Sequence, residues 1–336
     1  MTSRLVIAPN WIGDAVMSLP TIRALRRQYA GDRMTVLARP GPAAIYRAQG
    51  DANEVLVRAS FSADVLALRA RRFDEAWLLP NSMRAALLAF LSGASRRLGY
   101  ATDRRGWLLT HAPPPPPQTR HQLRDYDGLL RLAGVPPDVD PPRLRIPDPA
   151  AQRAREAVSA AGLTPAQFAV LCPASASAGT KRWPPERFAS LADRLAPLGY
   201  GCAVAVGPGE GGVAEAVGRS AHAALPVLGE DLDAVELAAV FGLARVVVSN
   251  DSGPAHLAAA VGTPVVAFFG PTDPGRTAPS GAPVRILDRY VFCSPCFLEV
   301  CPYGHECMRE ITVEMAVRAV EELTGTTAWD PSLSSG

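Results

Sequence analysis

Short apolar runs alternate with helical patterns along the first half of the chain. The runs are residues 4–9, 34–38, 54–57 and 75–79. Runs of this length are typical of buried parallel strands. After the first run, a helical pattern places four apolar side chains on one side: Val16, Leu19, Ile22 and Leu25. This β–α–β alternation predicts a doubly wound α/β domain.

The alternation restarts after a proline-rich stretch. Residues 136–149 hold six prolines, which favour an extended linker over regular structure. Beyond it, strand-like runs cover residues 168–172, 201–206, 245–249 and 264–269, and helical patterns cover residues 184–195, 254–261 and 315–323. We therefore predict an α/β protein of two Rossmann-like doubly wound domains that face a cleft, at residues 1–150 and 151–325, with a tail at residues 326–336.

Composition and charge narrow the setting in which the protein works. The 336 residues are 48% hydrophobic, enough for buried cores, and no run reaches the ~18 apolar residues of a spanning helix. The first apolar run is too short for a signal peptide, so we expect a cytoplasmic protein. Residues 1–150 carry 21 arginines against 13 acidic residues (+8), whereas residues 151–336 carry 13 basic and 19 acidic residues (−6). The basic half either meets an anionic partner, such as nucleic acid, an anionic membrane surface or an acidic glycolipid, or it is ordinary solvated surface.

One helix start is the best candidate for an anion site. The segment Asn250-Asp251-Ser252-Gly253 follows a predicted strand and begins a helix. At such a place unpaired N–H groups and the helix dipole attract phosphate. The alternative is an ordinary helix cap by Asp251 or Ser252. His256 lies on an apolar face of the same helix, where it is either a ligand or a core histidine.

A single lysine marks a second candidate site. Lys181 is the only lysine in the chain, which has 33 arginines. A compact ammonium aimed at one oxygen is poorly replaced by a guanidinium. A leaving phosphate is therefore a candidate partner for Lys181, with Arg182 beside it. The alternative is a surface cation ahead of the next helix.

A glycine-rich turn follows the second predicted strand of the C-terminal domain. Gly207, Gly209 and Gly212 form a G-x-G-x-x-G pattern, which alone is a weak sign of dinucleotide binding. Pro208 also removes one N–H donor from this turn. We interpret it as a sharp turn beside a nucleotide site, with Glu210 as a candidate ribose ligand. A nicotinamide oxidoreductase remains an alternative.

The end of the first predicted strand carries a candidate general base. Asn10, Gly13 and Asp14 stand where this strand meets its helix, and a carboxylate there can take a proton from a hydroxyl group. The alternative for Asp14 is a helix cap. Arg96 and Arg97, in one of several arginine clusters, are candidates for binding the phosphates or carboxylates of an acceptor.

Four cysteines stand close together near the end of the chain: Cys293, Cys296, Cys301 and Cys307. Their spacing, C-x₂-C-x₄-C-x₅-C, suits a structural zinc held by four thiolates. Such a zinc would pin residues 290–309 and take no part in catalysis. Free thiols, partial disulfides and an iron–sulfur cluster are the alternatives.

Several of these segments, in this order, resemble the lipopolysaccharide heptosyltransferases of glycosyltransferase family 9. They are PNWIGDAVMS at residues 9–18, FDEAWLLPNS at 73–82, TKRWPPERFASLA at 180–192, NDSGPAHLAAA at 250–260 and FFGPTDP at 268–274. The resemblance implies a GT-B architecture that binds the acceptor in the N-terminal domain and the donor in the C-terminal domain. It also implies an inverting transfer of heptose from ADP-L-glycero-β-D-manno-heptose onto the inner core of lipopolysaccharide.

The resemblance also implies roles for individual residues. Asp14 is then the general base, and Asn10, Gly13, Arg96 and Arg97 are assigned to the acceptor. The residues assigned to the donor are Lys181, Arg182, Glu210, Asp251, Ser252, Gly253 and His256. The expected chemistry requires no metal, and the expected setting is peripheral contact with the inner face of the inner membrane, without nucleic acid. A family member with another donor or acceptor, and a non-catalytic protein that binds a sugar nucleotide or a metal, are the alternatives.

Overall fold

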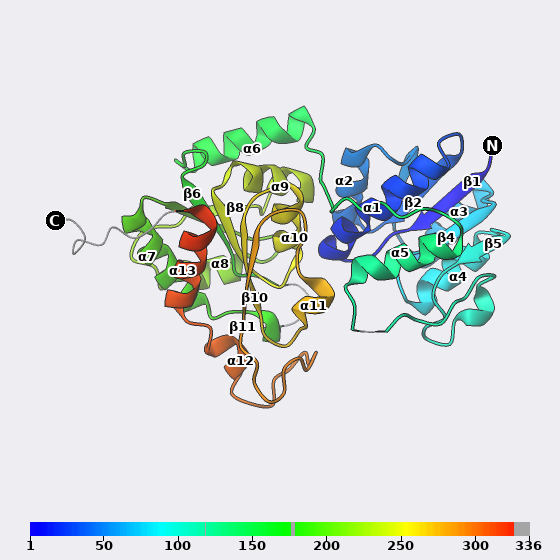
Figure 1. The fold of residues 1–336 in the computed structure, drawn as a ribbon. Coiled ribbons are helices and arrows are strands. Elements are labelled where there is room, and N and C mark those ends of the chain that lie inside the picture. Colours follow the sequence, from blue (N-terminus) through cyan, green and yellow to red (C-terminus); the bar gives the residue numbers. More distant parts are fainter. Residues whose placement is uncertain (118, 176–178, 326–336) are drawn as a thin grey trace. The chain divides into compact units, whose positions relative to one another are not determined.

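A computed structural model describes residues 1–117, 119–175 and 179–325 (Figure 1). The predicted tail at residues 326–336 lies outside the described residues. The chain divides into two compact units, Met1–Arg145 and Ile146–Gly336. This division falls within the proline-rich stretch that the sequence predicts as a linker. No helix in the described ranges is both long enough and apolar enough to span a membrane.

The first unit is built on a five-stranded parallel sheet with the order β3-β2-β1-β4-β5. Its strands are β1 (Ser3–Ile7), β2 (Arg33–Ala38), β3 (Glu54–Val57), β4 (Glu75–Leu78) and β5 (Arg96–Leu98). β1 pairs with β2 on one side and with β4 on the other. The strand order therefore reverses beside β1, and in doubly wound sheets ligands bind at the carboxyl ends of strands at such a switch point.

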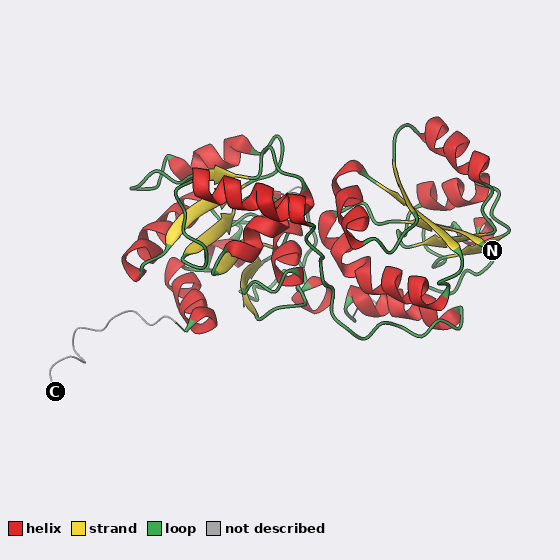
Figure 2. Ribbon diagram, turned by 90° about the horizontal axis from the view of Figure 1, so that it is seen from above, coloured by secondary structure: helices red, strands yellow, loops and turns green. Residues whose placement is uncertain are grey.

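Helices flank this sheet on both faces (Figure 2). α3 (Phe61–Arg71) and α4 (Met83–Leu91) bury apolar side chains against β1 and β4 in one core cluster. α1 (Ile12–Gln28) packs against both α2 (Pro40–Gln49) and α5 (Gln122–Leu132). A short 3₁₀ helix, η1, consists of Gly106–Leu108. Every residue of α1 from Ala15 to Ile22 is buried, so the core fixes the start of this helix just beyond β1.

The second unit repeats this architecture with six parallel strands in the order β11-β10-β9-β6-β7-β8. They are β6 (Phe168–Cys172), β7 (Gly201–Ala205), β8 (Val227–Leu228), β9 (Val246–Asn250), β10 (Val265–Phe269) and β11 (Val284–Asp288). Here the order reverses between β6 and β9, which are direct neighbours. The predicted doubly wound α/β fold is thus confirmed in both units.

The helices of the second unit also lie on both faces of its sheet (Figure 2). One core cluster contains side chains of α7 (Pro185–Leu195), α8 (Gly211–Gly218) and α13 (Val313–Thr324). α9 (Ala234–Leu243) packs against α6 (Asp148–Ala160) and α10 (Gly253–Ala260). The shorter elements are η2 (Gly179–Lys181), η3 (Ala196–Leu198), α11 (Pro274–Thr277) and α12 (Glu306–Arg309).

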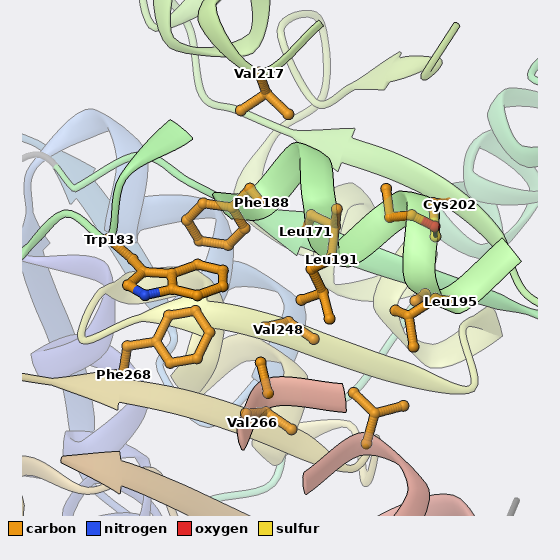
Figure 3. Close-up of a cluster of buried hydrophobic side chains, with 14 of the residues drawn as sticks. Leu171, Trp183, Phe188, Leu191, Leu195, Cys202, Val217, Val248, Val266 and Phe268 are labelled. Atoms are coloured by element: carbon orange, nitrogen blue, oxygen red, sulfur yellow. Dashed lines mark hydrogen bonds between the residues drawn. The ribbon is translucent and has the colours of Figure 1, made fainter. Parts of the chain in front are cut away.

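Trp183 anchors the loop between β6 and α7 in the core of this unit. Its ring centroid lies 4.5 Å from that of Phe268 and 5.1 Å from that of Phe188 (Figure 3). Its indole Nε1 donates a hydrogen bond of 2.8 Å to the carbonyl of Ile311. Because Trp183 is fully buried and only two residues from Lys181, this packing fixes the backbone that carries the lysine.

Candidate active site

The carboxyl edge of the second sheet brings together most of the predicted donor residues. Lys181 follows β6, Glu210 follows β7 and Asp251 follows β9. Because all the strands are parallel, these loops emerge at one edge of the sheet. Asn250 ties two of them together, since its side chain donates to the carbonyl of Pro173 (2.8 Å) and accepts from the Trp183 N–H (2.9 Å).

Lys181 is held by one carboxylate. Its Nζ lies 2.8 Å from Oδ2 of Asp251, which is only 6% exposed. The Thr272 hydroxyl donates to the same oxygen over 2.7 Å. Asp251 therefore fixes the direction of the ammonium, Ser252 and not Asp251 is the N-cap residue of α10, and the assignment of Asp251 to the donor stays a prediction.

The N-terminus of α10 begins directly after this ion pair. Ser252 is its N-cap residue, and within the described residues its side chain makes no capping hydrogen bond. Instead its Oγ lies 3.2 Å from Oγ of Ser249. Pro254 has no N–H and the Ala255 N–H bonds the carbonyl of Ser252 over 3.2 Å, so the first turn of α10 offers an anion chiefly the Gly253 N–H and the positive end of the helix dipole. His256 follows this turn and is buried, and its assignment to the donor stays a prediction.

Glu210 and Arg182 lie at the same edge, and each side chain forms a hydrogen bond within the protein. The Gly207 N–H donates to Oε2 of Glu210 over 2.9 Å, so this carboxylate stabilises its own turn. Burial, and then the charge of Glu210, raises the pKa of Cys172 at the end of β6. Arg182 Nη2 donates to the carbonyl of Ser175 (3.0 Å), whereas its buried Nε has no hydrogen-bond partner among the described residues.

Asp14 lies in the first turn of α1, at the carboxyl edge of the first sheet. Trp11, and not Asp14, is the N-cap residue of this helix. Nε2 of Gln122 donates to Oδ1 of Asp14 (3.2 Å) and to the hydroxyl of Tyr126 (2.8 Å). Burial, and then the charge of Asp14, raises the pKa of Tyr126 well above its usual value, so the phenol stays protonated.

Three arginines that sequence reasoning did not select lie near Asn10. Arg58 follows β3, and its Nη1 donates to Oδ1 of Asn10 over 2.8 Å. Arg58 Nε and Arg84 Nη2 each lie 3.7 Å from Oδ2 of Asp64. Burial, and then the nearby Arg84 and Arg39, lowers the pKa of Arg58. Two guanidinium groups, those of Arg58 and Arg84, flank the carboxylate of Asp64, and the charge of Arg39 acts on Arg58, so this part of the edge is positive.

Arg96 and Arg97 do not join this group. Arg96 pairs in register with Glu75, which pairs with Arg4 at the start of β1. Asn10 follows the end of β1, six positions beyond Arg4, or ~20 Å at 3.3 Å per residue. Arg96 forms an ion pair with Glu75 (3.1 Å), and Arg97 Nε donates to the carbonyl of Leu108 (2.7 Å). The structure therefore does not support their assignment to a shared site with Asn10, Gly13 and Asp14.

The four clustered cysteines line one small cavity, together with Thr180 and His305. All four are free thiols. Burial and the other three cysteines raise the pKa of Cys307 to about 11. Across the described ranges, no three or more His, Cys, Asp or Glu side chains form a group that could hold a metal ion. As they stand these residues do not fit a metal centre, and the zinc site stays a prediction.

Comparisons with known proteins show that this chain is similar to heptosyltransferases. The model of glycosyltransferase family 9 (heptosyltransferase) matches residues 65–306. The chain is 27% identical over 304 residues to lipopolysaccharide heptosyltransferase 2 of Salmonella typhimurium, with 84% of this chain and 87% of that protein covered. It is 27% identical over 348 residues to lipooligosaccharide heptosyltransferase 2 of Haemophilus influenzae, with 95% and 98% covered.

Solved structures agree with this fold. The structure of E. coli ADP-heptose lps heptosyltransferase II matches with a TM-score of 0.81 and 22% identity, covering 96% of this chain and 98% of that chain. A glycosyl transferase family 9 structure from Veillonella parvula matches with a TM-score of 0.83 and 22% identity, covering 97% and 98%. At these identities the structural matches establish the fold alone.

Proposed function

Because the chain belongs to glycosyltransferase family 9, the heptosyltransferases, we propose that it transfers L-glycero-D-manno-heptose from ADP-heptose onto heptose I of the lipopolysaccharide inner core. The observation that carries this proposal is the arrangement of Lys181, Asp251 and the N-terminus of α10 at one edge of the second sheet. This arrangement is suited to the diphosphate of a nucleotide sugar. The choice of heptose rests on the similarity to heptosyltransferases 2 over most of the chain.

The donor chemistry follows from charge. When the glycosidic bond breaks, negative charge grows on the diphosphate of the departing ADP. Lys181 and the first turn of α10 stabilise that charge, with Arg182 as a further cation. Asp251 keeps the ammonium directed. These groups balance the charge without a metal ion, so we propose that catalysis needs no metal cofactor.

The acceptor chemistry is assigned to the first unit. Asp14 takes the proton from the acceptor hydroxyl, whose oxygen then attacks the anomeric carbon from the side opposite ADP, which inverts the configuration. Gln122 orients the carboxylate through its amide. Arg39, Arg58 and Arg84 provide a positive surface beside Asn10 for the acidic groups of the core. This trio replaces Arg96 and Arg97 in the proposal.

The cellular location is proposed from the nature of the acceptor and from the charge of the chain. The acceptor is a membrane glycolipid, and the basic first half of the chain would favour peripheral contact with an anionic membrane surface. We place the enzyme at the cytoplasmic face of the inner membrane, with no role for nucleic acid.

A donor screen tests the proposal. Purified protein is incubated with truncated core acceptors and a panel of nucleotide sugars, and the masses of the products are measured by mass spectrometry. We expect one added heptose, from ADP-heptose. Transfer of another sugar would favour a family member with a different donor. Tight ADP binding without transfer to any acceptor would favour a sugar-nucleotide-binding protein.

A further inference from the structure

A segment with little regular structure lies beside the Lys181 loop. We call residues 289–307 the cysteine segment; it follows β11 and ends in α12, and it is coloured orange in Figure 1. Much of its apolar surface is exposed, including Phe292 (82%) and Val300 (80%). Such a segment lacks a core of its own, so its position depends on a few specific contacts.

The first set of contacts joins the cysteine segment to the loop after β10. The carbonyl of Pro271 accepts hydrogen bonds from the N–H groups of Cys296 (3.0 Å) and Phe297 (2.8 Å). The Ser294 hydroxyl donates to the carbonyl of Gly270. Pro271 immediately precedes Thr272, whose hydroxyl donates to the carboxylate that holds Lys181.

The second set of contacts joins the cysteine segment to the residue before Lys181. The hydroxyl of Thr180 donates to the carbonyl of Leu298 over 2.7 Å. The carbonyl of Thr180 is bonded by the ring Nε2 of His305. Thr180 is only 7% exposed, and it also lines the cavity of the four cysteines. The hydroxyl and the carbonyl of this buried residue are therefore both satisfied by the cysteine segment.

The two sets of contacts bracket the ion pair of Lys181 and Asp251. One lies next to Thr272 and the other next to Lys181, while Trp183 holds the far side of the lysine in the core. We propose that the cysteine segment positions Lys181 for reaction, acting through Thr180 as a positioning residue. The inference rests on the proposed function in one respect, that Lys181 faces the departing ADP.

Thr180→Val tests the proposal, because it removes the hydroxyl while nearly conserving shape. We expect turnover to fall on the order of 10-fold to 100-fold, since small displacements of a catalytic group have effects of that size. Affinity for ADP should also fall, while the KM for the acceptor stays unchanged. Thr180→Ser keeps the hydroxyl and should restore most of the activity. His305→Ala removes the second bond and should act in the same direction.

Thr263→Val is the matched control. Thr263 is also buried in the second unit, and its hydroxyl also donates to a main-chain carbonyl, that of Phe241, over 2.8 Å. Both valine variants should lower the melting temperature to a similar extent, but only Thr180→Val should lower turnover. Wild-type turnover in Thr180→Val and His305→Ala, an equal loss in Thr263→Val, or no rescue by Thr180→Ser would each overturn the proposal.

A second measurement needs no substrate. Because Lys181 is the only lysine, reductive methylation with ¹³C-formaldehyde labels its Nζ and the N-terminal amine alone. We expect the NMR signal of the Lys181 methyl groups to shift in Thr180→Val and to stay in place in Thr263→Val. An unchanged signal in Thr180→Val would overturn the positioning role. A wild-type protein that transfers no sugar, with the shift present, would instead refute the proposed function.

Discussion

At the residue scale, two aspartates in similar places have different partners. Asp14 and Asp251 each follow a parallel strand at the start of a helix. Asp251 faces the ammonium of Lys181, whereas Oδ1 of Asp14 accepts a hydrogen bond from the uncharged amide of Gln122. The amide of Gln122 orients the carboxylate of Asp14, whereas the carboxylate of Asp251 directs an ammonium. We therefore assign proton transfer to Asp14 and the orientation of Lys181 to Asp251.

Asp14→Asn should abolish the base while keeping the shape of the site. We expect turnover to fall by about 10²–10⁴-fold, the usual contribution of general base catalysis. ADP affinity, measured by calorimetry, should not change, because the proposed ADP ligands belong to the second unit. Asp127→Asn, on α5 and paired with Arg124 over 3.1 Å, is the control and should keep near-normal turnover. Normal turnover in Asp14→Asn would remove this residue from the mechanism.

Lys181→Arg should be damaging although it keeps the charge. Nζ of Lys181 reaches Oδ2 of Asp251 at 2.8 Å, and a planar guanidinium cannot occupy the same point. Losing one donor to developing charge typically costs about 10²–10³-fold in turnover, so we expect at least a 10-fold loss with partial replacement. Arg285→Lys, in a surface pair with Glu322, is the control for such a swap. Equal turnover and ADP affinity in Lys181→Arg and wild type would show that the ammonium has no special role.

Sequence reasoning found the residues that stand at the ends of apolar runs and missed those that approach from elsewhere. Asp14 and Asp251 can be predicted because each follows an apolar run that forms a strand. Lys181 can be predicted because it is the only lysine. Gln122 comes from 108 positions beyond Asp14, in a helix start with no sign of chemistry. Contacts of this kind depend on how helices pack across a sheet, which one sequence does not encode in a local pattern.

At the element scale, long apolar runs were predicted well and short or charged strands were not. β3 and β6 have the predicted bounds. β5 has the sequence Arg-Arg-Leu, and its two arginines look from sequence like candidate ligands for an acceptor. It forms a strand because Glu75 on β4 pairs with Arg96 across the sheet. β8, with two residues, and β11 were also missed, since short edge strands depend on a neighbour more than on their own pattern.

Gly270→Ala should destabilise the contact between β10 and the cysteine segment. A Cβ at Gly270 would lie 2.5 Å from Sδ of Met308 and 3.0 Å from Sγ of Cys307, and both side chains are buried. Overpacking of this kind costs about 1–3 kcal/mol, so the melting temperature should fall by several degrees. Gly212→Ala, in α8 with nothing within 4 Å of its Cβ, should be neutral or stabilising. Equal melting temperatures for the two variants would contradict this packing.

Metal analysis tests the prediction for the four cysteines. Zinc would require four sulfurs about 2.3 Å from one ion, so the cysteine segment would have to close around its cavity. If it closes, protein purified without chelators should contain about one zinc per chain. Cys301→Ser should then lower both zinc content and melting temperature, whereas Cys202→Ser, on β7, should leave the zinc unchanged. Absence of zinc and iron would end the metal prediction and leave free thiols.

At the scale of the whole molecule, charge is distributed unevenly along the chain and within the first unit. The first 150 residues carry the excess of arginines, but many of these have structural partners. Arg105 is fully buried, donates to three main-chain carbonyls, and has a pKa lowered by burial to about 10. Arg71 pairs with Glu54 over 2.6 Å. The net charge of the first half therefore overstates how many arginines remain available to bind an acidic acceptor.

The arginines at the carboxyl edge of the first sheet should decide acceptor binding. Arg39→Glu combined with Arg84→Glu reverses two charges around Arg58 and Asn10. We expect the acceptor KM to rise by about 10-fold or more, since charge-assisted contacts contribute about 1.5–3 kcal/mol each. ADP affinity should be unchanged, and the dependence of the acceptor KM on salt should weaken, because fewer cations attract the acidic core.

Arg69→Glu combined with Arg72→Glu is the matched control for this last prediction. Both arginines are exposed at the end of α3, which begins after β3 and runs back toward the start of β4, so they lie at the opposite edge of the sheet. The two double variants change the net charge of the unit equally. If position matters, only the first pair raises the acceptor KM. Equal effects would mean that the basic half attracts the acceptor, or the membrane that carries it, through total charge alone.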